Sequence, residues 1–260
     1  MDPVGVTDTG KQRHNNEDSF FISKRSFHKL PNLFIVADGM GGHNAGEVAS
    51  GHAIIFFKEY CEKTPFKRSE ILDHLIAACV YANEKVLDTA EANERFNGMG
   101  TTFSVCVRDK GKLYIAHIGD SRIYAVYDDK IKMLTNDHTY VYEMQKLGQI
   151  TEKQAKSHPR RNMLTKVLGV ERGVKFDGQV FELTDCLKIL LCTDGLTNML
   201  ADGDILKQMY GNNSDIAKRL VDMANANGGA DNITLIVFDA AGTGGEKGAT
   251  GTRRYNKRTV

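Results

Sequence analysis

Residues 33–42 read LFIVADGMGG, in which five apolar residues are followed by an acid and a glycine-rich turn. A short apolar run that stops at Asp or Gly is typical of a buried β-strand. Two further runs end in the same way, YIAHIGD at residues 114–120 and ILLCTDG at residues 189–195. A fourth run, DNITLIVF at residues 231–238, begins with its acid. The chain therefore repeats one pattern, a buried strand with an aspartate at one end.

The aspartates of these four runs are the chemically informative residues, namely Asp38, Asp120, Asp194 and Asp231. If they converge at one end of a sheet, each carboxylate raises the pKa of the others unless a cation neutralises them. Oxygen ligands suit hard ions such as Mg²⁺ and Mn²⁺, and a glycine beside the acid lets a backbone carbonyl approach the ion. One such aspartate is more often a turn residue. Four in the same context favour a metal site.

A charged segment, RHNNED at residues 13–18, stands directly before the apolar run SFFIS. Arg13 lies five residues ahead of Asp18, at the mouth of a predicted strand. A guanidinium placed there can bind a phosphate with its forked donors, close to the metal-binding acids. A solvated charged turn explains this segment equally well when it is taken alone.

Seven β-rich runs, most of them bounded by Gly, Asp or Asn, are predicted to form strands. They cover residues 19–23, 33–37, 102–107, 113–118, 122–126, 188–192 and 233–238. The spacing between residues 102 and 134 predicts a meander of neighbouring strands, with turns at residues 111–112 and 128–130.

Two long helical patterns lie between the early strands and this meander. They cover residues 45–60 and 69–90, and in the second one apolar residues recur with a 3.6-residue period. Ser69 is its predicted N-cap. A further helix is predicted over residues 214–224. Strands in two groups with helix pairs between them predict a layered α+β domain rather than alternating βαβ units.

The periodicity weakens between residues 138 and 168. Short helical pieces are predicted at residues 140–147 and 151–156, followed by the basic segment HPRRN. Such a stretch inside a compact domain is a mobile surface flap or a binding loop. Residues 242–260 are rich in Gly, Thr and basic residues, which predicts a disordered tail or a linker. We therefore expect one catalytic domain over residues 1–241.

The composition is that of an ordinary globular protein, with 41% hydrophobic and 26% charged residues. A formal net charge of +1 argues against a nucleic-acid binder, which usually has a basic excess. The five cysteines are scattered without a CxxC pair, which is typical of reduced cytosolic proteins. No apolar run approaches the roughly 18 residues that span a bilayer, and the start of the chain lacks a signal-peptide core. These features predict a cytoplasmic enzyme without a membrane span.

Six segments together resemble one known family. They are RHNNEDSF, VADGMGGHNAGEVAS, GMGTTFSV, AHIGDSRIY, LLCTDGLTNML and GGADNITLIVF. In this order and spacing they resemble the metal-dependent protein phosphatases of type 2C, particularly the compact bacterial serine/threonine phosphatases. The match runs from about residue 5 to residue 239. It implies a four-layer α-β-β-α sandwich, two antiparallel sheets flanked by helix pairs.

The resemblance also implies a set of metal ligands. Asp38 would bridge a first and a second Mn²⁺ or Mg²⁺, and the carbonyl of Gly39 would bind the second. Asp194 and Asp231 would hold the first ion. Asp120, with Asp194, matches the ligand pair of a weaker third ion.

Other positions match residues that act around these metals. Glu17 and Asp18 match acids that hold metal-bound waters, and Arg13 matches the residue that grips the substrate phosphate. Some family members carry a histidine as general acid where this chain has Met40, which cannot donate a proton. We expect a water on one of the metals to protonate the leaving group instead, with His43 as a weaker candidate.

The implied activity is hydrolysis of phosphoserine and phosphothreonine in proteins by a water that two metal ions activate. The chain has no CxxxxxR phosphate loop, which excludes the usual tyrosine-phosphatase chemistry. The expected partners of this monomer are a Hanks-type serine/threonine kinase and its substrates, without nucleic acid. The alternatives are another two-metal hydrolase, a partner-switching phosphatase for one small protein, and an inactive phosphoprotein-binding pseudo-enzyme. The last is disfavoured because every matched acid is present.

Overall fold

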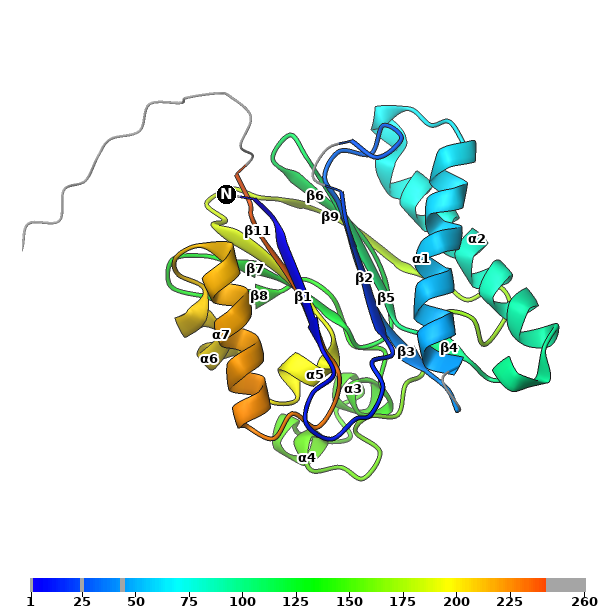
Figure 1. Ribbon diagram of the computed structural model, residues 1–260. Coiled ribbons are helices and arrows are strands. Elements are labelled where there is room, and N and C mark those ends of the chain that lie inside the picture. The colour runs from blue at the N-terminus through cyan, green and yellow to red at the C-terminus, as the bar shows by residue number, and fades with distance from the viewer. Residues whose placement is uncertain (1, 24–25, 43–44, 242–260) are drawn as a thin grey trace, which may run out of the picture.

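Two antiparallel sheets packed face to face form the centre of the molecule (Figure 1). The computed structural model describes residues 2–23, 26–42 and 45–241. The first sheet has the order β1 (Val4–Asp8), β11 (Ile233–Asp239), β10 (Lys188–Cys192), β7 (Arg122–Val126) and β8 (Ile131–Met133). The second has the order β2 (Asp18–Ile22), β3 (Leu33–Met40), β5 (Phe103–Asp109), β6 (Lys112–Ile118) and β9 (Asp177–Glu182), and the short β4 (Gly100–Thr101) also pairs with β3.

Helices cover the outer face of each sheet (Figure 1). The pair α1 (Ala45–Lys63) and α2 (Ile71–Glu91) lies on the second sheet, and α5 (Asp194–Thr197), α6 (Asp202–Gln208) and α7 (Asn213–Ala226) lie on the first. Two short helices, α3 (Tyr140–Lys146) and α4 (Glu152–Lys156), lie together at one end of the sandwich. The predicted four-layer α+β architecture is confirmed. None of the described helices is both long and apolar enough to cross a bilayer.

The uninterrupted apolar sequence of strand β3 is explained by its position in the sandwich. Ile35 and Ala37 face the layer beneath α1 and α2, whereas Phe34 and Val36 belong to the layer between the two sheets. Both faces of the strand are therefore buried, which removes the alternation seen in half-exposed strands. Between the sheets, Phe34 stacks on Phe238 of β11, with ring centroids 3.9 Å apart and planes inclined by 13°.

The predicted meander is wrong at its centre. β5 and β6 form one hairpin and β7 and β8 another, but β6 and β7 belong to different sheets. The chain crosses from one sheet to the other at Gly119, whose φ is +104°. A Cβ on Gly119 would lie 2.5 Å from Cβ of Thr102. A glycine is therefore required at this crossing, because both the conformation and the space exclude a side chain.

The sequence prediction also missed two edge strands and misplaced one cap. β1 and β9 were not expected, and in β9 half-buried and exposed residues alternate as on an edge. Ser69 does not cap α2, because it lies inside a 3-10 turn, Arg68–Glu70, that runs directly into the helix. The predicted tail, residues 242–260, lies outside the described residues.

Replacing Phe238 by alanine should lower the free energy of unfolding by about 3–5 kcal/mol, because a cavity would remain between the sheets. Urea unfolding followed by circular dichroism measures this loss. Leu147, whose side chain is 71% exposed, provides the control: Leu147→Ala should change stability by less than about 0.5 kcal/mol. A similar, small effect of both substitutions would contradict the importance of this aromatic stack.

Candidate metal centre

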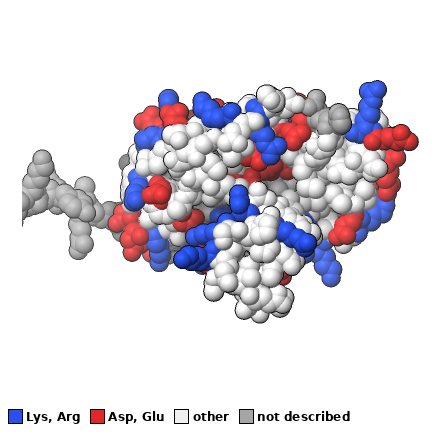
Figure 2. Space-filling model, turned by 90° about the horizontal axis from the view of Figure 1, so that it is seen from below, with Lys and Arg blue, Asp and Glu red and all other residues white. Residues whose placement is uncertain are grey.

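The strand registers bring the predicted acids to one edge of the sandwich. Asp18, the first residue of β2, pairs directly with Asp38 of β3. Asp120 lies between the end of β6 and the start of β7, in the link that joins the two sheets. Asp194 follows β10 and Asp231 precedes β11, and these two strand ends are adjacent because the strands are antiparallel. Figure 2 shows acidic side chains in a hollow at this edge, with basic side chains on its rim.

The electrostatic state of these acids reflects their mutual proximity. Burial raises the pKa of Asp38 well above its ordinary value, and the charges of Asp18 and Asp194 raise it further. Burial and the charge of Asp194 likewise raise the pKa of Asp120. Burial raises the pKa of Asp18 to about 7, although threonine hydroxyls bonded to it oppose the rise. The cluster therefore favours either protons or a metal cation.

Backbone hydrogen bonds hold Asp38 in this position. Its N–H donates to Oγ1 of Thr102 over 2.9 Å, and its carbonyl accepts from the hydroxyl of Thr101 over 2.9 Å. Oγ1 of Thr102 lies 2.7 Å from Oγ of Ser121, which joins the two sheets beside the acids. The sequence analysis did not single out these hydroxyl residues. The only local signal was the pair of threonines in GMGTTFSV.

Gly39 lies where the first turn of α1 meets β3. A Cβ on this residue would stand 2.1 Å from the carbonyl oxygen of Gly46 and 2.5 Å from that of Glu17. The carboxylate of Glu17 accepts a hydrogen bond from the backbone of Gly46, in the first turn of α1. Anions are favoured at that end of a helix. The packing of β3 against α1 therefore requires a glycine here, and the contact of the Gly39 carbonyl with a metal ion stays a prediction.

Protein donors hold two of the predicted metal ligands. Nη2 of Arg13 donates to Oδ2 of Asp231 over 2.8 Å, and both side chains remain partly exposed. Nδ2 of Asn198 donates to Oδ2 of Asp194 over 2.9 Å. Among the described residues, no three His, Cys, Asp or Glu side chains form a ready-made metal site. Oδ2 of Asp231 is therefore already paired with a protein cation.

Asn232 is a positioning residue that the sequence analysis missed. Its Nδ2 donates to the carbonyls of Thr9 and Asn15, each over 2.9 Å, and its Oδ1 accepts from the N–H of Glu17 over 2.9 Å. It therefore ties the loop that carries Arg13 to the start of β11. An asparagine directly after an acid was its only signal in the sequence.

Two carboxylate oxygens of this acidic cluster lack a hydrogen-bond donor, and a divalent cation could satisfy them. Oδ1 of Asp18 and Oδ1 of Asp194 are buried and have no hydrogen-bond partner within the described part of the chain. A buried carboxylate oxygen without a partner is costly unless a cation or another donor satisfies it. The donors at this edge are oxygen atoms, which suit Mn²⁺ and Mg²⁺.

The remaining predicted site residues lie around this edge. Met40 ends β3 and is 36% exposed, and His43 lies outside the described residues. The helices α3 and α4 of the predicted flap lie at the same end as the acids (Figure 1).

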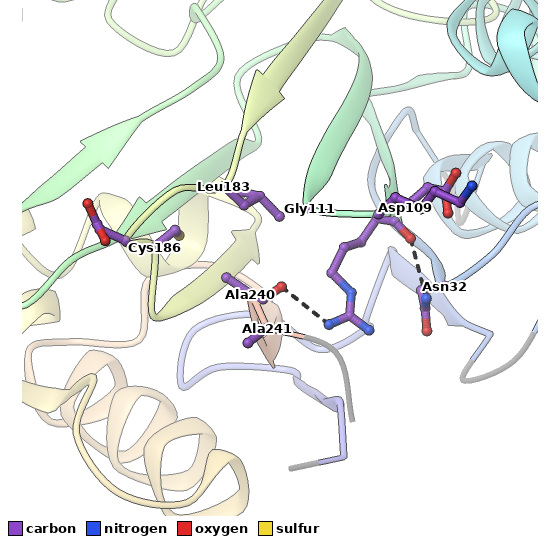
Figure 3. Close-up of a pocket in the computed structure, with 10 residues that line it drawn as sticks. Asn32, Asp109, Gly111, Leu183, Cys186, Ala240 and Ala241 are labelled. Carbon is purple, nitrogen blue, oxygen red and sulfur yellow. Dashed lines mark hydrogen bonds between the residues drawn. The ribbon is translucent and has the colours of Figure 1, made fainter. Parts of the chain in front are cut away.

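A cavity of about 670 Å³ lies at the opposite end of the strands, away from the acids (Figure 3). Gly111, at the start of β6, and Ala240, after β11, line it. Arg108 donates from Nη1 to the carbonyls of Asp239 and Ala240, over 3.0 and 3.3 Å. Its guanidinium is thus bonded to backbone carbonyls, and the cavity contains none of the predicted catalytic residues.

The sequence profile of the protein phosphatase 2C family matches residues 9–233. The chain belongs to this family. The resemblance that the six segments carry is thereby confirmed, and so is the enzyme class, a protein phosphatase.

Relatives of this phosphatase are similar over nearly its whole length. The serine/threonine phosphatase stp of Listeria welshimeri is 38% identical over 240 residues, which are 90% of this chain and 93% of that protein. The crystal structure of Stp1 from Staphylococcus aureus has a TM-score of 0.86 and 32% identity, covering 93% of this chain and 96% of that chain. The catalytic domain of the phosphatase PstP, solved with two manganese ions, has a TM-score of 0.78 and 31% identity, covering 90% and 96%.

The raised pKa values predict how the stability of this phosphatase depends on pH. A carboxyl whose pKa is higher in the folded state stabilises the fold at low pH, and this contribution is lost as the pH rises through the folded pKa. In EDTA, the Tm should therefore fall as the pH rises from about 4 to about 7, the interval between the ordinary pKa of an aspartate and the folded pKa of Asp18. It should fall less in Asp38→Asn, which lacks one of the titrating acids.

Differential scanning fluorimetry with and without Mn²⁺ measures this effect. The increase in Tm that Mn²⁺ produces should be larger at the higher pH, because the metal requires ionised ligands. Groups remote from Asp38 are common to the wild type and the variant, so their contribution cancels in the difference between the two proteins. An identical pH dependence for wild type and Asp38→Asn in EDTA would contradict the electrostatic account.

Proposed function

We propose that this phosphatase hydrolyses phosphoserine and phosphothreonine in other proteins, with two Mn²⁺ or Mg²⁺ ions bound among Asp38, Asp194 and Asp231. The observation that supports this most directly is the pair of buried, unpartnered oxygens of Asp18 and Asp194 in a cluster of acids with raised pKa. When bound, two such ions would lower the pKa of a water and neutralise charge on the phosphoryl oxygens.

The electrostatic neighbours of each acid support its proposed role. After burial, the charges of Asp18 and Asp194 raise the pKa of Asp38 most, which suits a central ligand shared by two ions. The charge of Asp231 has the corresponding effect on Asp194, which suits a pair that holds one ion. The charge of Asp194 has the strongest electrostatic effect on Asp120, in keeping with a shared, weaker third site.

We propose that Arg13 exchanges its bond with the carboxylate of Asp231 for a bond with the substrate phosphate. Its guanidinium pairs with Asp231, and its side chain is 50% exposed. With ions held by the acids, the forked donors of Arg13 would bind a phosphate beside them. The proton for the leaving oxygen must come from water or from His43, because Met40 offers none.

We further propose that the substrates are cytoplasmic proteins phosphorylated by a Hanks-type kinase. The relatives named serine/threonine phosphatase support the substrate class, and the open hollow of Figure 2 can admit a side chain that projects from a protein. This assignment distinguishes the enzyme from a two-metal nuclease or a small-molecule phosphatase.

Asp38→Asn and Asp194→Asn should each reduce Mn²⁺-dependent hydrolysis of a phosphothreonine peptide to below about 1% of wild type, because each removes a charged metal ligand. Asp222, an exposed acid on α7, provides the control, since Asp222→Asn leaves the centre intact. DNA and nucleotides assayed side by side should be poor substrates. Near wild-type turnover in either variant, or a preference for nucleic acid, would refute the proposal.

Arg13→Ala should raise the KM for the phosphopeptide by about tenfold, with a smaller effect on kcat, because one charge-assisted contact to phosphate is lost. The same variant should bind Mn²⁺ more tightly than wild type, since no guanidinium then competes for Asp231. Calorimetric titration measures this gain, and Arg13→Lys should lie between the two. Weaker Mn²⁺ binding in Arg13→Ala would contradict the proposed exchange of anions.

A further inference from the structure

The turn that carries Asp120 is held by a residue from a distant part of the chain, His138. The N–H of His138 donates to the carbonyl of Gly119 over 2.8 Å, and the N–H of Gly119 donates to Nδ1 of the His138 ring over 3.1 Å. Gly119 is further confined by its φ of +104° and by the side chain of Thr102. The backbone immediately before Asp120 is therefore fixed from two sides.

These contacts also determine the tautomer of His138. A backbone N–H can only donate, so Nδ1 accepts and the ring proton resides on Nε2. Nε2 lies 3.3 Å from Oδ2 of Asp177, the first residue of β9. Burial lowers the pKa of His138 more than Asp177 raises it, which favours the neutral ring. A neutral ring with its proton on Nε2 is the form that can hold Gly119.

A second buried histidine keeps the ring of His138 in place. The rings of His117 and His138 have centroids 5.2 Å apart. His117 lies 2.8 Å from Oγ of Ser104 through Nδ1 and 3.1 Å from the carbonyl of Asn136 through Nε2. Both ring nitrogens of His117 are therefore hydrogen-bonded to other residues, and its ring packs against the ring of His138.

His138 also begins the predicted flap. Its carbonyl accepts from the N–H of Thr165 over 2.8 Å, and Thr139 pairs with Leu164 in an isolated bridge. The backbone of His138 thus joins the two ends of the flap. Its ring is bonded to the turn that precedes Asp120. The base of the flap and the turn before Asp120 are therefore both bonded to this one residue.

We propose that His138 is a positioning residue, which fixes the carboxylate of Asp120 beside Asp194 and couples it to the base of the flap. The catalytic meaning of this role rests on the proposed function, in which Asp120 and Asp194 share a weaker metal site. The structural part of the proposal, the hold on Gly119, does not depend on it.

Two substitutions separate the contacts of His138. His138→Asn places an amide oxygen near the position of Nδ1, so it can still accept from Gly119, but it cannot reach Asp177. His138→Gln can reach Asp177 but offers no acceptor at the position of Nδ1. Tyr142→Phe is the matched control, because it removes a flap-base hydrogen bond, 2.7 Å to Oδ1 of Asn136, that does not touch the turn.

Hydrogen exchange of the peptide segment 113–122 in the metal-free protein tests the structural part. In His138→Gln the Gly119 amide should exchange at least about tenfold faster than in wild type, whereas His138→Asn and Tyr142→Phe should remain close to wild type. Equal exchange in His138→Gln and wild type would overturn the proposal. If His138→Gln does not fold, His138→Leu replaces it, because it also lacks an acceptor for the N–H of Gly119, and an unchanged rate would overturn the proposal.

Mn²⁺ titration and kinetics test the catalytic part. In His138→Gln, the Mn²⁺ concentration required for half-maximal activity should rise and kcat should fall, each by about 10–100-fold, with KM for the phosphopeptide unchanged. His138→Asn should restore most of both. Losses that are the same in the Asn and Gln variants, and that follow Tm alone, would show a merely structural histidine. A wild-type protein inactive on phosphopeptides would refute the proposed function, while the exchange data would still decide the role of His138.

Discussion

Repulsion between buried carboxylates governs this molecule. Asp18 and Asp38 are partners across a strand ladder, so the hydrogen-bonded backbone, rather than any attraction between side chains, holds them together. Asp120, Asp194 and Asp231 are brought to the same edge by strand ends and helix starts in the same manner. The sandwich thus maintains an arrangement that its own charges oppose. Because bound cations would remove this opposition, the fold itself favours the proposed metal binding.

The interface between the two sheets changes character towards this edge. Farther from the acids it is apolar and tightly packed, as the stacked rings of Phe34 and Phe238 show. Beside the acids it is a seam of hydroxyl groups, in which Thr193 donates to Asp18 over 2.9 Å and Thr102 meets Ser121 over 2.7 Å. Apolar packing supplies most of the driving force for folding. The hydroxyl seam orients the acids without adding charge.

Two arginines among the described residues act on this negative charge. Arg13 pairs with Asp231 while half exposed, and Arg122 is engaged with Asp137 through three contacts of 2.6 to 3.2 Å. A partly exposed ion pair is weak, since water and salt screen it, and a divalent ion or a phosphate can displace it. The arginine next to the acids is therefore exchangeable. That property suits the phosphate-binding role proposed for Arg13.

Local patterns in the sequence indicated the strands and helices, the acids at the strand ends and the family, because each of these signals lies within a few neighbouring residues. The crossing at Gly119 was not predicted: two consecutive hairpins look alike whether they share a sheet or not. Contacts such as Arg13 with Asp231, Asn232 with Thr9, and His138 with Gly119 join residues far apart in the chain. Such pairings arise only when packed sheets bring their ends together, since no periodicity or turn signal encodes which distant donor will face which acceptor.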